Sequence, residues 1–184
     1  MKHFSAIILA CALAIPAFAQ DAKTNTTAAA VESSGQTFAA AVAAVTAPLV
    51  LTNDYLCLTN DSMADAASGG KAVFSFTITN AGDYVVEALA NAPDDNANSF
   101  FLNIDTAPTD EMIWDFDVAD GFEKHIANWR GSGDAGSPEF APKIFKLEPG
   151  DHKVILVGRE PGTLLKSLTI RPAAPDETNS PPAN

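Results

Sequence analysis

Apolar and polar residues alternate along the middle of the chain, from about residue 47 to residue 172. Roughly eight to ten short runs follow this period of two, among them YLCLT, KAVFSFTIT, SFFLNID and HKVILVG. Segments rich in Gly, Pro, Asn and Asp separate the runs, and no run keeps a helical period. The pattern therefore predicts an all-β domain, an antiparallel β-sandwich or jelly roll.

Two turns between these runs predict β-hairpins. In FTITNAGDYVVEA the chain reverses at Ala81-Gly82, and in FKLEPGDHKVILV it reverses at Pro149-Gly150, where Pro presets φ and Gly accepts a positive φ. The inward residues of both hairpins are expected to form the core. Burying Phe76 or Ile155 contributes about 1.5 to 3 kcal/mol each, so polar replacements at either position are expected to unfold the domain.

The N-terminus has the pattern of a secretory signal peptide over residues 1–19. Lys2 precedes an apolar run over residues 4–15, which is too short to span a bilayer, and the small-x-small triplet Ala17-Phe18-Ala19 forms a cleavage site. An alternative is lipid attachment at Cys11, which follows small and apolar residues. Either pattern predicts a protein that is secreted or periplasmic.

Composition divides the rest of the chain into three parts. Residues 20–46 are rich in Thr and Ala and predict a flexible linker, whereas residues 173–184 are Pro-rich and polar and predict a disordered tail. The β-sandwich domain is expected to occupy residues 47–172. No stretch after the leader is long and apolar enough to cross a membrane.

Charge and cysteine content exclude several classes of function. The formal net charge is −12, so the surface repels phosphate backbones and nucleic acid is not an expected partner. Cys57 alone would remain after processing, so no intrachain disulfide is expected, and we predict that it is a small buried apolar residue. His125 and His152 are far from it in sequence, which argues against a zinc site.

Several elements in a fixed order resemble a known family. AGDYVVEALANAP, NSFFLNID, IWDF and NWRGSG, followed by FKLEPGDHKVILVGREPGTLLKSLTI, resemble the galactose-binding-like jelly roll of carbohydrate-binding modules of families six and thirty-five, over about residues 71–171. The resemblance implies a two-sheet sandwich that binds sugars without catalysis, often with a structural calcium. Leu165-Lys166 stands where the family has Leu-Asp, and a lysine opposes a bound cation. We therefore assign no metal ligand and expect no cofactor, with calcium left open.

Four residues are candidates for sugar binding. Trp129 sits where a strand runs into a Gly/Ser loop and is expected to stack on a pyranose, with Asn128 and Arg130 bonding the hydroxyls. Phe122, after Asp120-Gly121, is a second candidate platform. The alternative is that Trp129 is a core anchor and that Arg130 only pairs with an acid.

Other conspicuous residues are assigned to architecture. Trp114 lies in mid-strand and is expected in the core. Arg159 ends an alternating run and precedes a Pro-Gly turn, so we predict that it ties strand ends together by bonding loop carbonyls or a carboxylate such as Asp105 or Asp115. Glu160 is then expected to face solvent or the turn.

No motif indicates catalysis. The chain contains no G-x-S-x-G, no H-E-x-x-H and no Gly-rich phosphate loop. Asp115 and Asp117 lie two apart and resemble a glycosidase pair, but one small sandwich rarely supplies the cleft. We therefore expect a secreted, non-catalytic carbohydrate-binding module. The alternative is a structural or adhesive extracellular β-sandwich that binds a protein partner or self-assembles.

Overall fold

The computed structural model describes residues 29–31, 35–134 and 137–178. The predicted signal peptide, Cys11 and the last residues of the predicted tail lie outside this part of the chain. Within the described part, no helix is long and apolar enough to span a bilayer.

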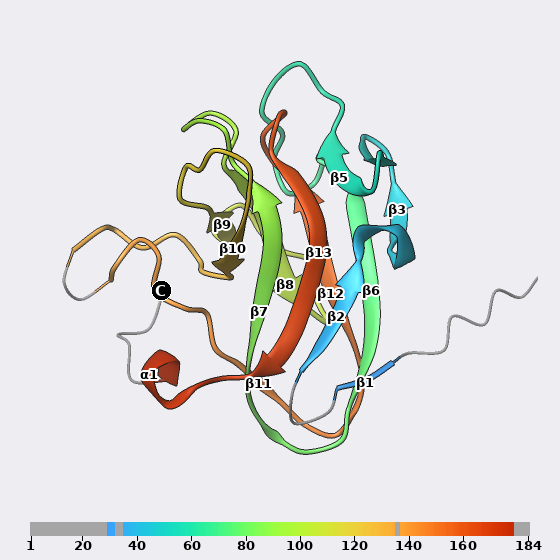
Figure 1. The fold of residues 1–184 in the computed structure, drawn as a ribbon, viewed down its shortest axis with the longest axis vertical. Coiled ribbons are helices and arrows are strands. Elements are labelled where there is room, and N and C mark those ends of the chain that lie inside the picture. Colours follow the sequence, from blue (N-terminus) through green and yellow to red (C-terminus); the bar gives the residue numbers. More distant parts are fainter. Residues whose placement is uncertain (1–28, 32–34, 135–136, 179–184) are drawn as a thin grey trace, which may run out of the picture.

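Two sheets pack face to face, and β7 and β13 of one lie in front of β8 and β12 of the other (Figure 1). Sheet A has the order β1 (Ala29–Val31), β6 (Lys71–Ile78), β12 (Gly150–Gly158), β8 (Ser99–Ile104), β9 (Ile113–Asp115), and β3 (Ala44–Thr46) also pairs with β6. Sheet B has the order β10 (Phe122–Ile126), β7 (Gly82–Asn91), β13 (Leu164–Pro172), β5 (Tyr55–Leu58), β4 (Leu49–Thr52), with β11 (Phe145–Leu147) on β7 and β2 (Gln36–Ala39) on β13. The predicted all-β jelly-roll sandwich is confirmed.

The core lies between the two sheets and is built from alternate residues of their strands. Phe74 and Phe76 of β6 are buried, as the alternation predicts, and Trp114 of β9 is fully buried as expected. Ile155, however, is only half buried, because its neighbours Val154 and Leu156 are the residues of β12 that point inward. The run KVILV is apolar on both faces, so its sequence alone does not show which set faces the core.

Both predicted hairpins are corrected by the strand pairing. β6 pairs with β12 in sheet A, whereas β7 pairs with β13 and β10 in sheet B, so the turn at Ala81-Gly82 carries the chain from one sheet to the other. The turn at Pro149-Gly150 likewise connects β11 in sheet B to β12 in sheet A. Turn residues determine where a chain reverses, but they do not determine whether the next strand pairs with the last one or packs across from it.

The predicted linker is also corrected, since part of it belongs to the sandwich. β2, the 3-10 turn η1 (Ala40–Val42) and β3 lie within residues 20–46, and β2 pairs with β13. Phe38 of β2 is buried and its ring meets that of Phe74 edge-on, with centroids 6.5 Å apart. One buried phenylalanine and a ladder of backbone hydrogen bonds therefore order a segment that composition alone assigns to a linker.

The start of the predicted disordered tail is ordered as well. The short helix α1 (Pro175–Thr178) follows β13, and Glu177 is held there by Arg171, with Nη2–Oε1 and Nη1–Oε2 distances of 2.6 and 2.9 Å. Glu177 also accepts a hydrogen bond from the backbone N–H of Ala174. The folded part of the chain therefore extends past the predicted boundary at residue 172, through α1 to residue 178.

Candidate functional site

Trp129 is the first residue that the sequence proposes for sugar stacking. Its ring is half buried and packs edge-on against Phe145, and its indole N–H donates to the carbonyl of Leu102 over 3.0 Å. The ammonium of Lys143 lies 3.5 Å from the centre of the ring. These contacts are those of a core anchor, the alternative role, and Lys143 covers one face that a sugar would use.

Asn128 and Arg130 are occupied by Asp115. The Asn128 side chain is buried, its Oδ1 accepts from the backbone N–H of Asp115, and its Nδ2 donates to the Asp115 carbonyl, over 3.1 and 2.8 Å. Arg130 grips the Asp115 carboxylate through both Nε and Nη2, and this hydrogen bonding raises the pKa of Arg130 above its usual value. The backbone and the carboxylate of Asp115 are therefore both bound by neighbouring side chains.

Arg159 and Glu160 form a buried pair at the end of β12. Arg159 donates to Glu160 Oε1 and, over 2.7 Å, to Ser99 Oγ at the start of β8, while Glu160 Oε2 accepts the N–H of Asn98. The prediction that Arg159 ties strand ends together is confirmed, but its carboxylate partner is its own neighbour. The expectation that Glu160 faces solvent or the turn is wrong, because both side chains are about nine-tenths buried.

Phe122 remains accessible and lies on the outward face of sheet B. Its relative exposure is 36%, and its ring centroid lies 6.3 Å from that of Tyr55 on β5. The Lys166 ammonium lies 5.6 Å from the Phe122 ring centroid, within the range of a cation–π interaction. Strands β10, β13 and β5 thus bring two aromatic rings and one cation together.

Strand register places polar groups beside this pair. Phe122 lies opposite Asn91 on β7, and Leu89, two residues earlier, lies opposite both Lys124 and Ser167. Because Ala88 and Ala90 point into the core, Leu89 and Asn91 point to the same outward face as Phe122. We call the surface formed by Tyr55, Leu89, Asn91, Phe122, Lys166 and Ser167 the outer face of sheet B.

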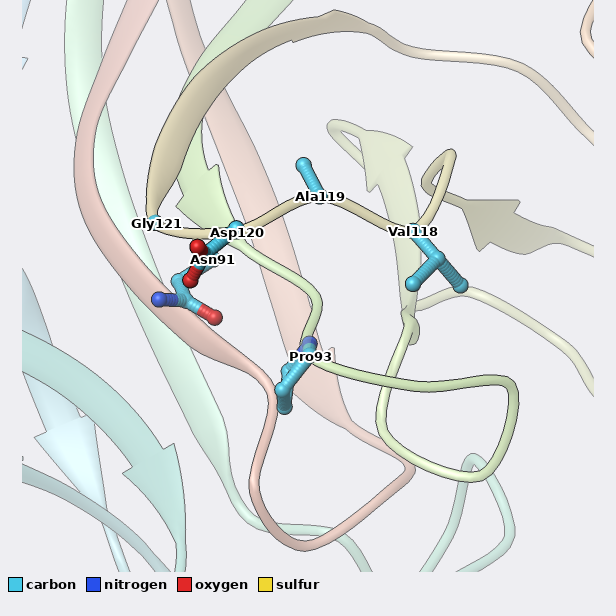
Figure 2. Close-up of a pocket in the computed structure, with 6 residues that line it drawn as sticks. All are labelled: Asn91, Pro93, Val118, Ala119, Asp120 and Gly121. Carbon is cyan, nitrogen blue, oxygen red and sulfur yellow. The ribbon is translucent and has the colours of Figure 1, made fainter.

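Two hollows lie on this outer face. The Asn91 hollow, with a volume of about 360 Å³, is lined by Asn91, Pro93, Val118, Ala119, Asp120 and Gly121, and Figure 2 shows the polar Asn91 and Asp120 at one side with Val118 at the other. A hydrogen bond of 3.0 Å from the N–H of Ala119 to the carbonyl of Ala92 ties its loop to the end of β7. The Lys166 hollow, of about 320 Å³, is lined by Ala39, Ala41, Asp54, Leu89, Lys166 and Ser167.

The chemistry of the outer face suits a neutral ligand with many hydroxyls. An exposed aromatic ring supplies an apolar platform, Asn91 supplies an amide on the facing strand β7, and Lys166 and Ser167 supply an ammonium and a hydroxyl on β13. The carboxylates come from Asp120 and Asp54, which line the two hollows. Of the four predicted binding residues, Phe122 alone belongs to this surface. Tyr55, Asn91 and Lys166 come from three strands that are distant in sequence, so no local pattern groups them with Phe122.

The donor set does not match the family's calcium site at the position that the resemblance marks. Lys166 stands there, and its ammonium is directed to the Phe122 ring, where a carboxylate ligand would be required. Within the residues that the structure describes, no group of three or more His, Cys, Asp or Glu side chains is placed to hold a metal ion.

The fold is a jelly-roll sandwich of the kind found in carbohydrate-binding modules. A native family 35 carbohydrate-binding module from Clostridium thermocellum matches with a TM-score of 0.51 and 10% identity over 76% of this chain and 99% of that module. The mannan-binding module from Man5C matches with 0.51 and 19% identity over the same shares, 76% and 99%. The GH26-CBM35 β-(1,4)-mannanase of Podospora anserina matches with 0.54 and 14% identity over 78% of this chain, but only 29% of that enzyme.

These likenesses concern the fold, since the identities are low. No protein-family model matches the sequence, and no curated protein matches it. The chain corresponds to nearly the whole of the two isolated modules and to less than a third of the mannanase.

Proposed function

We propose that this chain is an exported, non-catalytic carbohydrate-binding module that holds a neutral polysaccharide on the outer face of sheet B. The observation that carries the proposal is the exposed Phe122 ring beside Tyr55, on the sheet face where Asn91 lines one hollow and Lys166 and Ser167 line another. Export is supported by the leader pattern of residues 1–19.

In this proposal the Phe122 ring contacts the C–H face of one sugar unit. Asn91 and Asp120 bond the hydroxyls of the unit in one hollow, and Lys166 and Ser167 bond those of the unit in the other. Catalysis is not part of the proposal. The acids of the two hollows are Asp120 in one and Asp54 in the other, whereas a pair of carboxylates that cleaves a glycosidic bond would share one hollow.

The test is binding to a panel of insoluble polysaccharides, followed by calorimetric titration with soluble oligosaccharides. Mannan comes first in the panel, because one structural neighbour is a mannan-binding module. Phe122→Ala is expected to weaken binding about tenfold, since losing an aromatic contact of roughly 1.5 kcal/mol changes Kd by that factor. Phe122→Tyr keeps the platform and is expected to bind like the original protein.

A matched control separates the ring contact from a general loss of surface. Met63→Ala removes a large apolar side chain that is 60% exposed and lines neither hollow, so it is expected to leave binding unchanged. Melting temperatures of all variants establish that they are folded. No binding to any glycan, together with a concentration-dependent oligomer, would favour the structural or adhesive alternative instead.

A further inference from the structure

The loop that leads into β10 contains Asp120-Gly121, the one Asp-Gly pair in the sequence. Both residues line the Asn91 hollow, and Figure 2 shows them at the same side of it as Asn91. Phe122, the first residue of β10 and the platform of the outer face of sheet B, follows directly.

An Asp-Gly pair is chemically reactive because the aspartate side chain reaches its own backbone. The backbone nitrogen of the following residue attacks the side-chain carboxyl carbon and closes a five-membered ring. A glycine has no side chain to hinder this approach, and its backbone turns more freely than that of any other residue. Whether a given pair reacts therefore depends on how firmly the structure holds the two groups.

Here both groups are free. Asp120 is exposed, and none of the described residues forms a hydrogen bond or an ion pair with its carboxylate. In the same part of the chain, no loop or turn hydrogen bond uses the N–H of Gly121, because the nearby carbonyl of Ala92 accepts the N–H of Ala119 instead, over 3.0 Å.

The surroundings of Gly121 also leave room for the ring. Its φ of +112° is a conformation that glycine accepts and other residues rarely adopt. A Cβ placed on Gly121 would meet no other atom within 4 Å, so the space beside its backbone is open. The segment belongs to no strand, and turning its peptide groups therefore breaks no sheet ladder.

Asp65-Ala66 shows the opposite case within the same molecule. The Asp65 carboxylate accepts the N–H groups of Ala67 and Ser68 over 3.1 and 2.8 Å. The N–H of Ala66 donates to the Asp110 carboxylate over 2.7 Å. Both reacting groups are tied there, although the following residue is almost as small as glycine.

We propose that Asp120-Gly121 is a site of spontaneous isomerisation to isoaspartate. A bond forms between the nitrogen of Gly121 and Cγ of Asp120, and the carboxyl OH leaves with the amide proton as water, which gives a succinimide. Water then opens the ring at one of its two carbonyl carbons. Attack at Cγ restores aspartate, whereas attack at the backbone carbonyl carbon gives isoaspartate, so water is the only other reactant.

Isomerisation changes the outer face of sheet B, and this consequence rests on the proposed function. In isoaspartate the main chain runs through Cγ, so it is one carbon longer immediately before Phe122. The remaining carboxylate sits directly on Cα, away from the position from which Asp120 bonds a sugar hydroxyl. The isomerised chain is therefore expected to bind polysaccharide about tenfold more weakly, the effect of losing one good contact.

The experiment compares fresh protein with protein kept for weeks at neutral pH. Peptide mapping by electron-transfer mass spectrometry distinguishes isoaspartate from aspartate at each position. We expect isoaspartate to accumulate at residue 120 and not at residue 65. Chains with and without isoaspartate are then separated by ion exchange, and each is tested against the polysaccharide panel, beginning with mannan.

Three variants test the mechanism. Asp120→Glu keeps the carboxylate but would need a six-membered ring, so it is expected to remain unmodified and to keep its binding with age. Asp120→Asn reaches the same succinimide faster by losing ammonia, and is expected to speed the change. Asp117→Glu is the matched control, since Asp117 is exposed but is followed by Val118, and it should age like the original protein.

Different results would overturn different statements. No more isoaspartate at residue 120 than at residue 65 after ageing would refute the modification site. Isoaspartate at residue 120 in a fraction that binds as tightly as fresh protein would refute its effect on the outer face and leave the proposed function standing. If even fresh protein binds no glycan, the proposed function fails, while isoaspartate at residue 120 would still establish the modification.

Discussion

The buried pair of Arg159 and Glu160 makes a quantitative prediction about stability. Glu160→Gln keeps the shape of the side chain and an oxygen for the N–H of Asn98, but it leaves the Arg159 guanidinium buried without a counter-charge. Arg159→Met does the converse and also leaves Ser99 Oγ without its donor. In each variant the remaining charge is buried without its partner, so its desolvation cost is no longer offset.

The magnitude follows from the burial of both side chains, which are 10% and 9% exposed. Removing one partner of such a pair destabilises a protein by about 3 to 5 kcal/mol, whereas replacing both by apolar residues is much less harmful. We expect each single variant to lose about that amount. The double variant Arg159→Met with Glu160→Met should lose clearly less than the sum of the two, because no unpaired charge is left.

Urea unfolding followed by tryptophan fluorescence measures these losses, since the fully buried Trp114 changes environment on unfolding. With an m-value of about 2 kcal/mol per M, the midpoint of each single variant should fall by roughly 1.5 to 2.5 M. A Glu160→Gln midpoint within about 0.5 M of the original would show that the charge is solvated after all. Additive losses in the double variant would equally contradict the reasoning.

Three further predictions concern other parts of the domain. Burial lowers the pKa of His152, but hydrogen bonds to Asp105 and a backbone carbonyl outweigh burial and raise the pKa above 6.5, so the stability that His152 contributes is present below pH 6.5 and is lost as pH rises through the folded pKa. His152→Gln should remove this pH dependence of the melting temperature, and an unchanged dependence in the variant would contradict the reasoning. Hydrogen bonding to Arg171 lowers the pKa of Glu177 below 4.5, so the stability that Glu177 contributes is present above that pH and is lost as pH falls through the folded pKa. The melting temperature of Glu177→Gln should be lower than that of the original protein at pH 7 and should converge with it in acid, whereas a constant difference at every pH would refute this. Trp129→Phe loses the bond to a buried carbonyl and should lower the free energy of unfolding by about 1 to 3 kcal/mol without changing glycan affinity, whereas lost binding at unchanged stability would restore a direct role for this ring.

Residue type and local setting say less about which side chains reach the surface than alternation says about the fold. Trp129 is followed by a loop rich in Gly and Ser, a setting typical of an exposed platform, but its ring turns back toward Leu102 and Phe145. Nothing in the local sequence indicates that Lys143 will cover it. In the sequence, Lys166 is notable only because it replaces an acidic ligand of the family that the chain resembles. Its contact with Phe122 depends on β10 and β13 both pairing with β7.

The C-terminal end of the domain is a second place where the sequence pattern gave a wrong prediction. Pro-rich, polar residues after β13 predict disorder, yet Glu177 finds Arg171 and α1 is held. Arg171 and Glu177 are close in sequence, but the strength of their pairing depends on the half-buried position of Arg171 beside β7, where its Nη2 lies 3.8 Å from Glu87 Oε2. Composition averages over such pairs and cannot detect them.

The alternation of side chains by itself indicated that residues 47–172 form strands, where turns separate them, and that Phe74, Phe76 and Trp114 are buried, but it did not reveal β1, β2 and β3. Those properties depend on neighbours within a few residues, so the local pattern of apolar and polar residues predicts them. Tertiary structure alone decided which strands pair, which sheet each turn leads to, and which polar groups reach the surface beside Phe122. Those outcomes depend on contacts between segments distant in sequence, where hydrophobic burial and backbone pairing select one of many arrangements compatible with the same alternation.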